Sequence, residues 1–169
     1  VTQRDASQPF RFPVDRSFTM KGFGTVVTGT VVSGQIGKDE PVWQYPRRRP
    51  LRIRGLQIHG RPAERVFAGQ RAAINLAAVE KSEIARGAQL AAENSLLIGY
   101  LLNVELRLLK DIPRNLTQRT RVRLHLGTSE VIGRLVLLEQ AAFAPGETQR
   151  VQLRLETPVA ARHGDRFII

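Results

Sequence analysis

Apolar and polar residues alternate along several segments of this chain, most clearly over residues 102–108, 122–126 and 151–155. Alternation with a period of two is typical of β-strands that bury one face. Turn-forming residues punctuate these segments, as at Ser33-Gly34 and Pro145-Gly146. Only residues 79–84 have a pattern that suits a short turn of helix. Many short strands with frequent turns predict an all-β fold built from β-barrels.

The length of the chain suits two consecutive β-barrels. Its 169 residues are enough for two small domains, each with its own core. A boundary near residues 92–99 separates a first part rich in glycine and arginine from a second part with longer strands. We therefore predict a linker over residues 1–8, one barrel over 9–93 and a second barrel over 98–169.

The chain is strongly basic, with 26 Lys and Arg residues against 15 Asp and Glu residues and a net charge of +11. Only four of these cations are lysines, so most of the charge comes from arginine, whose planar fork suits phosphates and carboxylates. A small protein of this charge most often meets a polyanion, and nucleic acid is the leading candidate. The alternative is a genome rich in G and C that encodes its basic residues as arginine.

A basic stretch over residues 47–65 contains seven arginines and only one acid, Glu64. It could follow RNA phosphates, with each contact adding to a salt-dependent affinity, or it could be a solvated loop. Aromatic residues are scarce, which disfavours a protein that reads single-stranded bases by stacking. The candidate contacts with an RNA backbone are Lys21, Arg52, Arg54 and Arg61.

Several kinds of site and location are disfavoured by composition. The chain has no cysteine, which excludes disulfides, thiolate metal sites and a cysteine nucleophile. Its three histidines lack metal-ligand spacing and no nucleophile lies beside a base, so we expect neither a metal nor catalysis. The longest apolar stretch, residues 94–104, is too short to span a bilayer, and no signal peptide opens the chain. We expect a cytoplasmic protein without membrane contact.

Six segments resemble, in order, those of the elongation factor Tu family of translational GTPases. They are FGTVVTG at 23–29, GKDEP at 37–41, AGQRA at 68–72, EIARG at 83–87, GTSEVIG at 127–133 and HGDRF at 163–167. The resemblance implies the second and third domains of such a factor. The first barrel would hold the aminoacylated end of a transfer RNA, and the second would contact the transfer RNA stem and the GTPase domain.

Within this family, three further segments resemble the selenocysteine-specific elongation factors: DRSF at 15–18, KG at 21–22 and HLGTSE at 125–130. General elongation factors carry two acids where this chain has Asp15 and Arg16. The resemblance implies a factor that binds selenocysteinyl-tRNA and delivers it to the ribosome at recoded UGA codons. The alternatives are a general tRNA- or ribosome-binding factor and the GTPase subunit of a sulfate-activating enzyme.

The sequence lacks the phosphate loop GxxxxGK[ST] and the DxxG and NKxD motifs that a GTPase needs. The resemblance implies that a GTPase domain, with GTP and Mg, precedes Val1 and is joined to it by residues 1–8. It also implies an extension after the second barrel that binds a messenger RNA hairpin. On this interpretation the chain is a fragment, and we expect it to be monomeric, without a cofactor and without GTP hydrolysis of its own.

The apolar phase over residues 51–59 shifts at Gly55, which predicts a β-bulge there. Beyond the shift, Leu56 and Ile58 point inward, and so do the even-numbered residues over 71–76. The two patterns together predict four outward-facing residues: Gln57, His59, Arg71 and Asn75.

Matching each position to the family places five residues around the pocket for the esterified amino acid: Asp15, Arg16, Phe18, His59 and Arg71. Phe18 would form a wall, and Asp15 would orient Arg16 or receive the amino group. A selenol is more acidic than a cysteine thiol, whose pKa is about 8.5, so selenocysteine is an anion at neutral pH and serine is not. Arg16 and Arg71 would favour the anion through charge-assisted hydrogen bonds of about 1.5–3 kcal/mol each.

Simpler interpretations of these residues stay open from the spacing alone. Asp15 beside Arg16 could be a surface ion pair, usually contributing less than about 1 kcal/mol. His59 could be an ordinary strand histidine.

Overall fold

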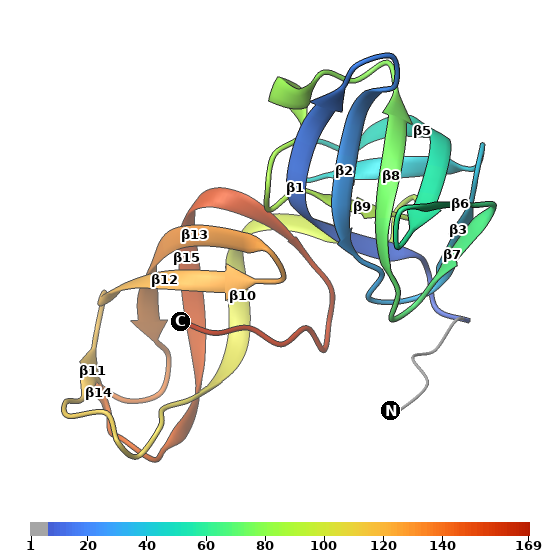
Figure 1. Ribbon diagram of the computed structural model, residues 1–169. Coiled ribbons are helices and arrows are strands. Elements are labelled where there is room, and N and C mark those ends of the chain that lie inside the picture. The colour runs from blue at the N-terminus through green and yellow to red at the C-terminus, as the bar shows by residue number, and fades with distance from the viewer. Residues whose placement is uncertain (1–6) are drawn as a thin grey trace. The chain divides into compact units, whose positions relative to one another are not determined.

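The structure is a computed structural model that describes residues 7–169. These residues form two compact units. The first contains the residues up to Leu97 with 127–129 and 160–165, and the second contains 98–126, 130–159 and 166–169. Apart from strands, the described residues form one three-residue 3₁₀ turn, η1 (Lys81–Glu83), within the segment where a turn of helix is predicted. The predicted all-β class is confirmed (Figure 1).

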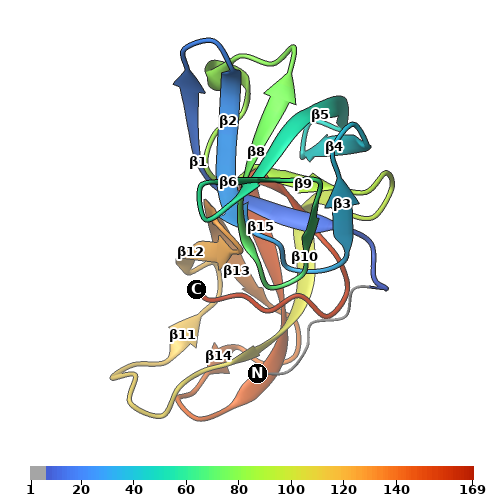
Figure 2. The same ribbon diagram turned by 45° about the vertical axis from the view of Figure 1, so that its right-hand side comes forward.

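The first unit is organised around a closed barrel. Six strands follow one another in the order β4-β9-β1-β2-β8-β5, and β4 pairs back with β5 to close the ring. A further strand, β6, extends β5 as a hairpin, and β3 and β7 form a separate two-stranded sheet (Figure 2). The strands are β1 (Arg11–Met20), β2 (Gly24–Thr30), β3 (Gln35–Gly37), β4 (Pro41–Tyr45), β5 (Arg49–Ile58), β6 (Arg61–Ala63), β7 (Arg65–Phe67), β8 (Arg71–Ala77) and β9 (Gln89–Ala91).

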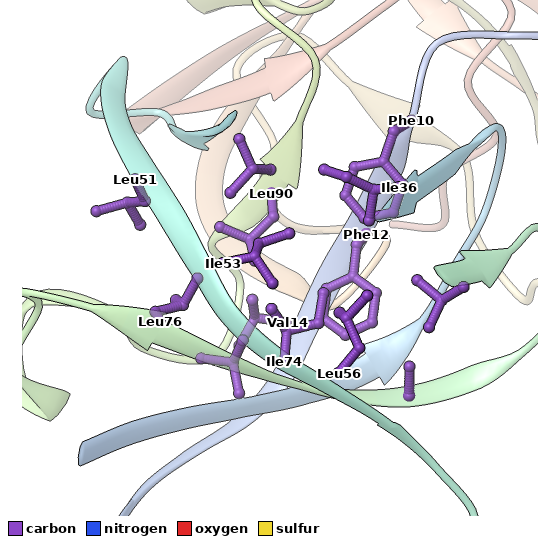
Figure 3. Packing of buried hydrophobic residues seen from close by; sticks show 14 of the residues in the cluster. Phe10, Phe12, Val14, Ile36, Leu51, Ile53, Leu56, Ile74, Leu76 and Leu90 are labelled. Carbon is purple, nitrogen blue, oxygen red and sulfur yellow. The ribbon is translucent and has the colours of Figure 1, made fainter. Parts of the chain in front are cut away.

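Alternate residues of these strands fill the barrel. Val14, Ile53, Leu56 and Ile74, from three different strands, pack together in its core (Figure 3). In β8 the even-numbered residues are buried and the odd-numbered ones are at least partly exposed, as the alternation predicts. Removal of this apolar surface from water is the main driving force for closing the barrel.

The predicted bulge in β5 is confirmed. The register of β5 against β8 shifts between Ile53 and Gly55, which leaves Arg54 as the extra residue. Because of that shift, Ile53 and Leu56 both face the core although they are three residues apart. Gln57 consequently lies on the outer face, in register with Ala73.

The second unit contains a four-stranded sheet in the order β10-β15-β13-β12 and a two-stranded ribbon of β11 and β14, which lie side by side in Figures 1 and 2. Leu124 and Leu126 are buried while Arg121, Arg123 and His125 are exposed, which confirms the predicted alternation. The strands are β10 (Leu97–Arg107), β11 (Leu116–Thr117), β12 (Arg121–Leu126), β13 (Ser129–Leu137), β14 (Ala142–Phe143) and β15 (Thr148–Ala161).

Residues 7–169 lack two features that would indicate a membrane or metal role. No helix there has the length and apolar character needed to cross a membrane. Nor does that part of the chain bring three or more His, Cys, Asp or Glu side chains together in an arrangement that could hold a metal ion.

Candidate functional site

A second bulge, in β1, determines where Asp15 and Arg16 point. Val14 pairs with Gly29 and Arg16 pairs with Thr28, so Asp15 is an extra residue between two consecutive positions of β2. Val14 is fully buried, whereas Arg16 is exposed and Asp15 is partly exposed. The bulge therefore presents two adjacent side chains, Asp15 and Arg16, on the outer face of the barrel, where a regular strand would present only one.

Gly29 makes this bulge possible. A Cβ atom at Gly29 would lie 2.2 Å from the carbonyl oxygen of Pro13, closer than any side chain tolerates. The close approach of β1 and β2 beside the bulge thus requires a residue without a side chain.

Asp15 joins three strands through its carboxylate. The hydroxyl of Thr28 on β2 donates a hydrogen bond of 2.7 Å to Oδ1, and Arg71 on β8 donates one of 2.6 Å to Oδ2. Partial burial of Asp15 acts to raise its pKa. The hydrogen bonds from Arg71 and Thr28, with the charges of Arg71 and Arg16, outweigh that effect and lower the pKa below its ordinary value. Asp15 is therefore an anion at neutral pH.

The structure corrects one detail of the predicted arrangement. The residue that Asp15 holds by a hydrogen bond is Arg71, whereas Arg16 acts on it through charge. Both arginines lie on the outer face, because Arg16 pairs with Thr28 and Arg71 with Thr30, two residues further along β2.

Small side chains separate these charged groups from β5. Across the four strands, one row on the outer face runs from Arg16 through Thr28 and Ala73 to Gln57. The neighbouring row runs from Phe18, which is 36% exposed, through Val26 and Asn75 to Gly55. The two middle strands of the face, β2 and β8, thus carry small or apolar residues together with Asn75, while Arg16 and Gln57 lie on the outer strands β1 and β5.

His59 differs from its predicted position. It does not lie on the outer face of a strand: β5 ends at Ile58, which pairs with Arg61, so His59 and Gly60 form a two-residue hairpin turn. Both have positive φ angles, 51° and 76°, as such a turn requires. Because Ile58 also pairs with Ala72, His59 lies at the same end of the sheet as Arg71. Asn-Gly is the dipeptide that usually signals this turn. Here His59 replaces the asparagine, so the turn was not predicted.

The four candidate RNA contacts, Lys21, Arg52, Arg54 and Arg61, are spread over the β1–β2 turn, β5 and β6 of the first unit. Lys21 lies in the turn between β1 and β2, and Arg61 lies in β6 opposite Ile58. Arg52 is six residues before Ile58 on β5, roughly 20 Å along the strand. Arg52 is also 3.7 Å from Asp39, with its side chain 72% exposed.

Acids from outside residues 47–65 form ion pairs with arginines of the basic stretch, although the stretch itself contains only one acid, Glu64. Arg49 pairs with Glu83, and Arg65 pairs with Glu40 at 2.5 Å. Three arginines of this stretch, Arg49, Arg52 and Arg65, therefore lie beside acids from outside residues 47–65.

A hollow of about 620 Å³ lies at the start of β2, away from the Asp15 bulge. Arg54 and Glu83 contribute to its lining, and the Glu83 pKa is lowered by a backbone hydrogen bond from Glu80 and by its hydrogen bond from Arg49. Asp15, Arg16 and Arg71 do not line this hollow. The complete lining is Gly24, Thr25, Arg54, Leu76, Ala78, Val79, Glu80 and Glu83.

Three residues of the outer face were not among the predicted site residues. Thr28 orients the Asp15 carboxylate, and the TG pair at 28–29 gave no signal of that contact. Gln57 and Asn75 face outward as predicted, but their side chains were given no role. The Oδ1 atom of Asn75 is shielded from solvent and has no hydrogen-bond partner within residues 7–169.

Comparisons with known protein families match both units. The family model described as "Elongation factor Tu domain 2" matches residues 24–91, and the one described as "Selenocysteine-specific elongation factor, beta-barrel domain" matches residues 103–169. These matches confirm the predicted pair of consecutive β-barrels.

Curated relatives named "Selenocysteine-specific elongation factor" align with nearly the whole chain. The protein from Desulfomicrobium baculatum is 42% identical over 96% of this chain and 26% of its own length. Those from Escherichia coli K12 and Haemophilus influenzae are 35% and 31% identical over 95% and 98% of this chain, and over 24% and 26% of their own lengths. The chain thus spans about a quarter of each relative. It belongs to the family of selenocysteine-specific elongation factors, of which it represents the two β-barrel domains.

Proposed function

We propose that this chain supplies the aminoacyl-binding face of a factor that carries selenocysteinyl-tRNA to the ribosome. The observation that carries the proposal is the Asp15 bulge, which gathers Arg16 and Arg71 on one face of the first barrel. Phe18 lies on the same face, and His59 lies at the end of the sheet where Arg71 begins β8. The names of the curated relatives support this assignment.

The charges on this face favour an anionic side chain over a neutral one. Two guanidinium groups and one carboxylate leave a net charge of +1. Arg71 uses one terminal nitrogen for Asp15, so its other donors stay available to a ligand. Arg16 forms no hydrogen bond or ion pair through its side chain within the described residues, so it is the freer cation. A selenolate gains from both arginines, while a serine hydroxyl gains only neutral hydrogen bonds.

The experiment that tests this compares the affinities of the intact factor for selenocysteinyl-tRNA and seryl-tRNA. We expect Arg16→Ala to reduce the preference for selenocysteine by about tenfold or more, which corresponds to one lost charge-assisted hydrogen bond. We expect Arg71→Ala to reduce it as well and also to release Asp15. Arg86→Ala, which removes an exposed arginine elsewhere in the first unit, is the matched control.

An unchanged preference in both variants would remove the charge argument. A general tRNA-binding factor would show affinity that ignores the amino acid. The GTPase subunit of a sulfate-activating enzyme would show no tRNA binding and would instead have a tight enzyme partner.

The rest of the proposed activity belongs to the intact factor. We propose that GTP and Mg bind in a separate GTPase domain, that delivery is to recoded UGA codons, and that a messenger RNA hairpin is bound outside these two barrels. The present chain would then act in the cytoplasm as a monomeric binding module without catalysis. Nucleotide binding and hydrolysis by the intact factor, compared with those of this chain alone, test this division of roles.

A further inference from the structure

Two arginines stand directly opposite each other on the outer face of the second unit. Arg134 in β13 is in register with Arg154 in β15. Both are exposed, while the adjacent cross-strand pair, Leu135 and Leu153, is fully buried. Residues directly opposite in an antiparallel pair have Cβ atoms about 4.5–5.5 Å apart, and like charges in that position are destabilising.

Neither arginine has an acidic partner in residues 7–169. The Nε atom of Arg154 donates to Gln152 Oε1 at 2.9 Å, and Gln152 Nε2 donates to Asn103 Oδ1 at 3.1 Å. This chain of hydrogen bonds fixes the stem of Arg154, and its two terminal nitrogens have no acceptor among the residues that the structure describes. Within the described part of the chain, the single acceptor for the Arg134 side chain is the carbonyl oxygen of Arg119, at 3.5 Å.

The neighbouring strand β12 shows that acids are available on this unit. Arg123 lies 3.1 Å from Glu130, and Arg121 lies 3.9 Å from Glu156. The acids thus accompany the arginines of β12, while the pair across β13 and β15 stays uncompensated.

We propose that Arg134 and Arg154 together bind one phosphate group of an RNA backbone. Each guanidinium presents a planar fork of donors that matches the oxygens of a phosphate. A single phosphate between the two forks would satisfy the free donors and remove the repulsion between the cations. The inference rests on the proposed function only for the identity of the anion as RNA, and it does not involve the aminoacyl face on the first barrel.

The test measures binding of this chain to an RNA hairpin with a continuous base-paired stem, by fluorescence anisotropy at several salt concentrations. The variants are Arg134→Gln, Arg154→Gln and the double substitution. Arg114→Gln is the matched control, because Arg114 is an exposed arginine of the second unit without an ion pair in the described residues.

We expect each single variant to lower the affinity by about tenfold and to reduce the slope of log affinity against log salt by about one. The RNA affinity of the double variant should be no lower than that of the single variant with the lower affinity, because both residues hold the same phosphate and its contact is lost only once. Arg114→Gln should leave the affinity almost unchanged. The unfolding temperature of Arg134→Gln should stay the same or rise by about 1–3 °C, since a repulsion is removed.

Unchanged RNA affinity in both single variants would overturn the proposal, and so would losses that simply add in the double variant. If Arg134→Gln lowers the unfolding temperature, Arg134→Lys, which keeps the positive charge, shows whether the lost RNA affinity comes from misfolding or from the missing charge. If Arg134→Lys restores both the unfolding temperature and the slope of log affinity against log salt, the phosphate site is supported. If it restores the unfolding temperature alone, the proposal is overturned.

Inorganic phosphate, added at constant ionic strength, distinguishes the source of the anion. It should raise the unfolding temperature of the unchanged chain and not that of Arg134→Gln. This response together with unchanged RNA affinity would assign the pair to free phosphate and overturn the RNA assignment. The hairpin carries no amino acid, so its binding does not depend on the aminoacyl face. Failure of the Arg134–Arg154 proposal in this test is therefore distinguishable from failure of the proposed selenocysteine preference.

Discussion

Replacement of Asp15 by asparagine tests how the face of the first barrel is held together. The Asp15 side chain is 22% exposed and that of Arg71 is 54% exposed, so solvent screens their pair. We assign the pair about 0.5–1 kcal/mol for that reason. The hydrogen bond from the Thr28 hydroxyl is stronger to the Asp15 carboxylate than to a neutral asparagine oxygen, and this difference adds a similar amount to the stability. Asp15→Asn should therefore destabilise the chain by about 1–2 kcal/mol at pH 7.

The loss should depend on pH in a defined direction. Folding lowers the Asp15 pKa, so the native state binds this proton more weakly than the unfolded state does. The stabilisation is then fully present above the unfolded pKa of about 3.9 and is lost as the pH falls through the lower folded pKa. The difference between the unchanged chain and Asp15→Asn should accordingly shrink below pH 3.9.

Urea unfolding at pH 7 and at pH 3, followed by circular dichroism, measures both effects. Carboxyl ¹³C chemical shifts measure the Asp15 pKa directly. Glu64→Gln is the matched control, because Glu64 is exposed and its side chain has no ion pair in the described residues. A destabilisation by Asp15→Asn that stays constant from pH 7 to pH 3 would refute the reasoning, since it would not come from the ionised carboxylate.

Three further substitutions probe the same region. Gly29→Ala should cost about 3 kcal/mol or more in urea unfolding, because its Cβ would lie 2.2 Å from the Pro13 carbonyl oxygen; a cost below about 1 kcal/mol would contradict the close approach. Thr28→Val should cost about 1 kcal/mol and move the Asp15 pKa up toward its ordinary value, and an unmoved ¹³C titration would argue against the hydroxyl contact. His59→Asn should stabilise the hairpin turn by a few tenths of a kcal/mol in thermal unfolding, and a clear loss would mean that the imidazole makes contacts the turn does not require.

The sequence predicted the parts of the fold that depend on local patterns. Alternation along 122–126 and 71–76 specified which residues are buried, because one face of each strand must leave water. The phase shift at Gly55 located a bulge because apolar residues flank it on both sides. The closure of the barrel by β4 and β5 could not be predicted in this way, since it depends on pairing partners that alternation does not identify.

The bulge at Asp15 shows why the site was harder to predict than the fold. Val14 is followed by Asp15, Arg16 and Ser17, so no apolar residue marks the change of phase. The partner of Asp15 is 56 residues away in the sequence, whereas the adjacent Arg16 is the one that spacing suggests. The same limit applies to Arg49 and Glu83, whose pairing requires strands to be brought together by the barrel.

The pairing of Asp15 with Arg71 also explains why an acid belongs on a face proposed to bind an anion. Two guanidinium groups on one sheet face, with no carboxylate between them, would repel each other and adopt many side-chain conformations. Asp15 holds Arg71 by a hydrogen bond, yet it cancels only one of the two charges. The face keeps a net positive charge with one fixed and one freer cation, which favours an anionic side chain through orientation as well as attraction. An acid in place of Arg16 would reverse the net charge of the face and remove that preference.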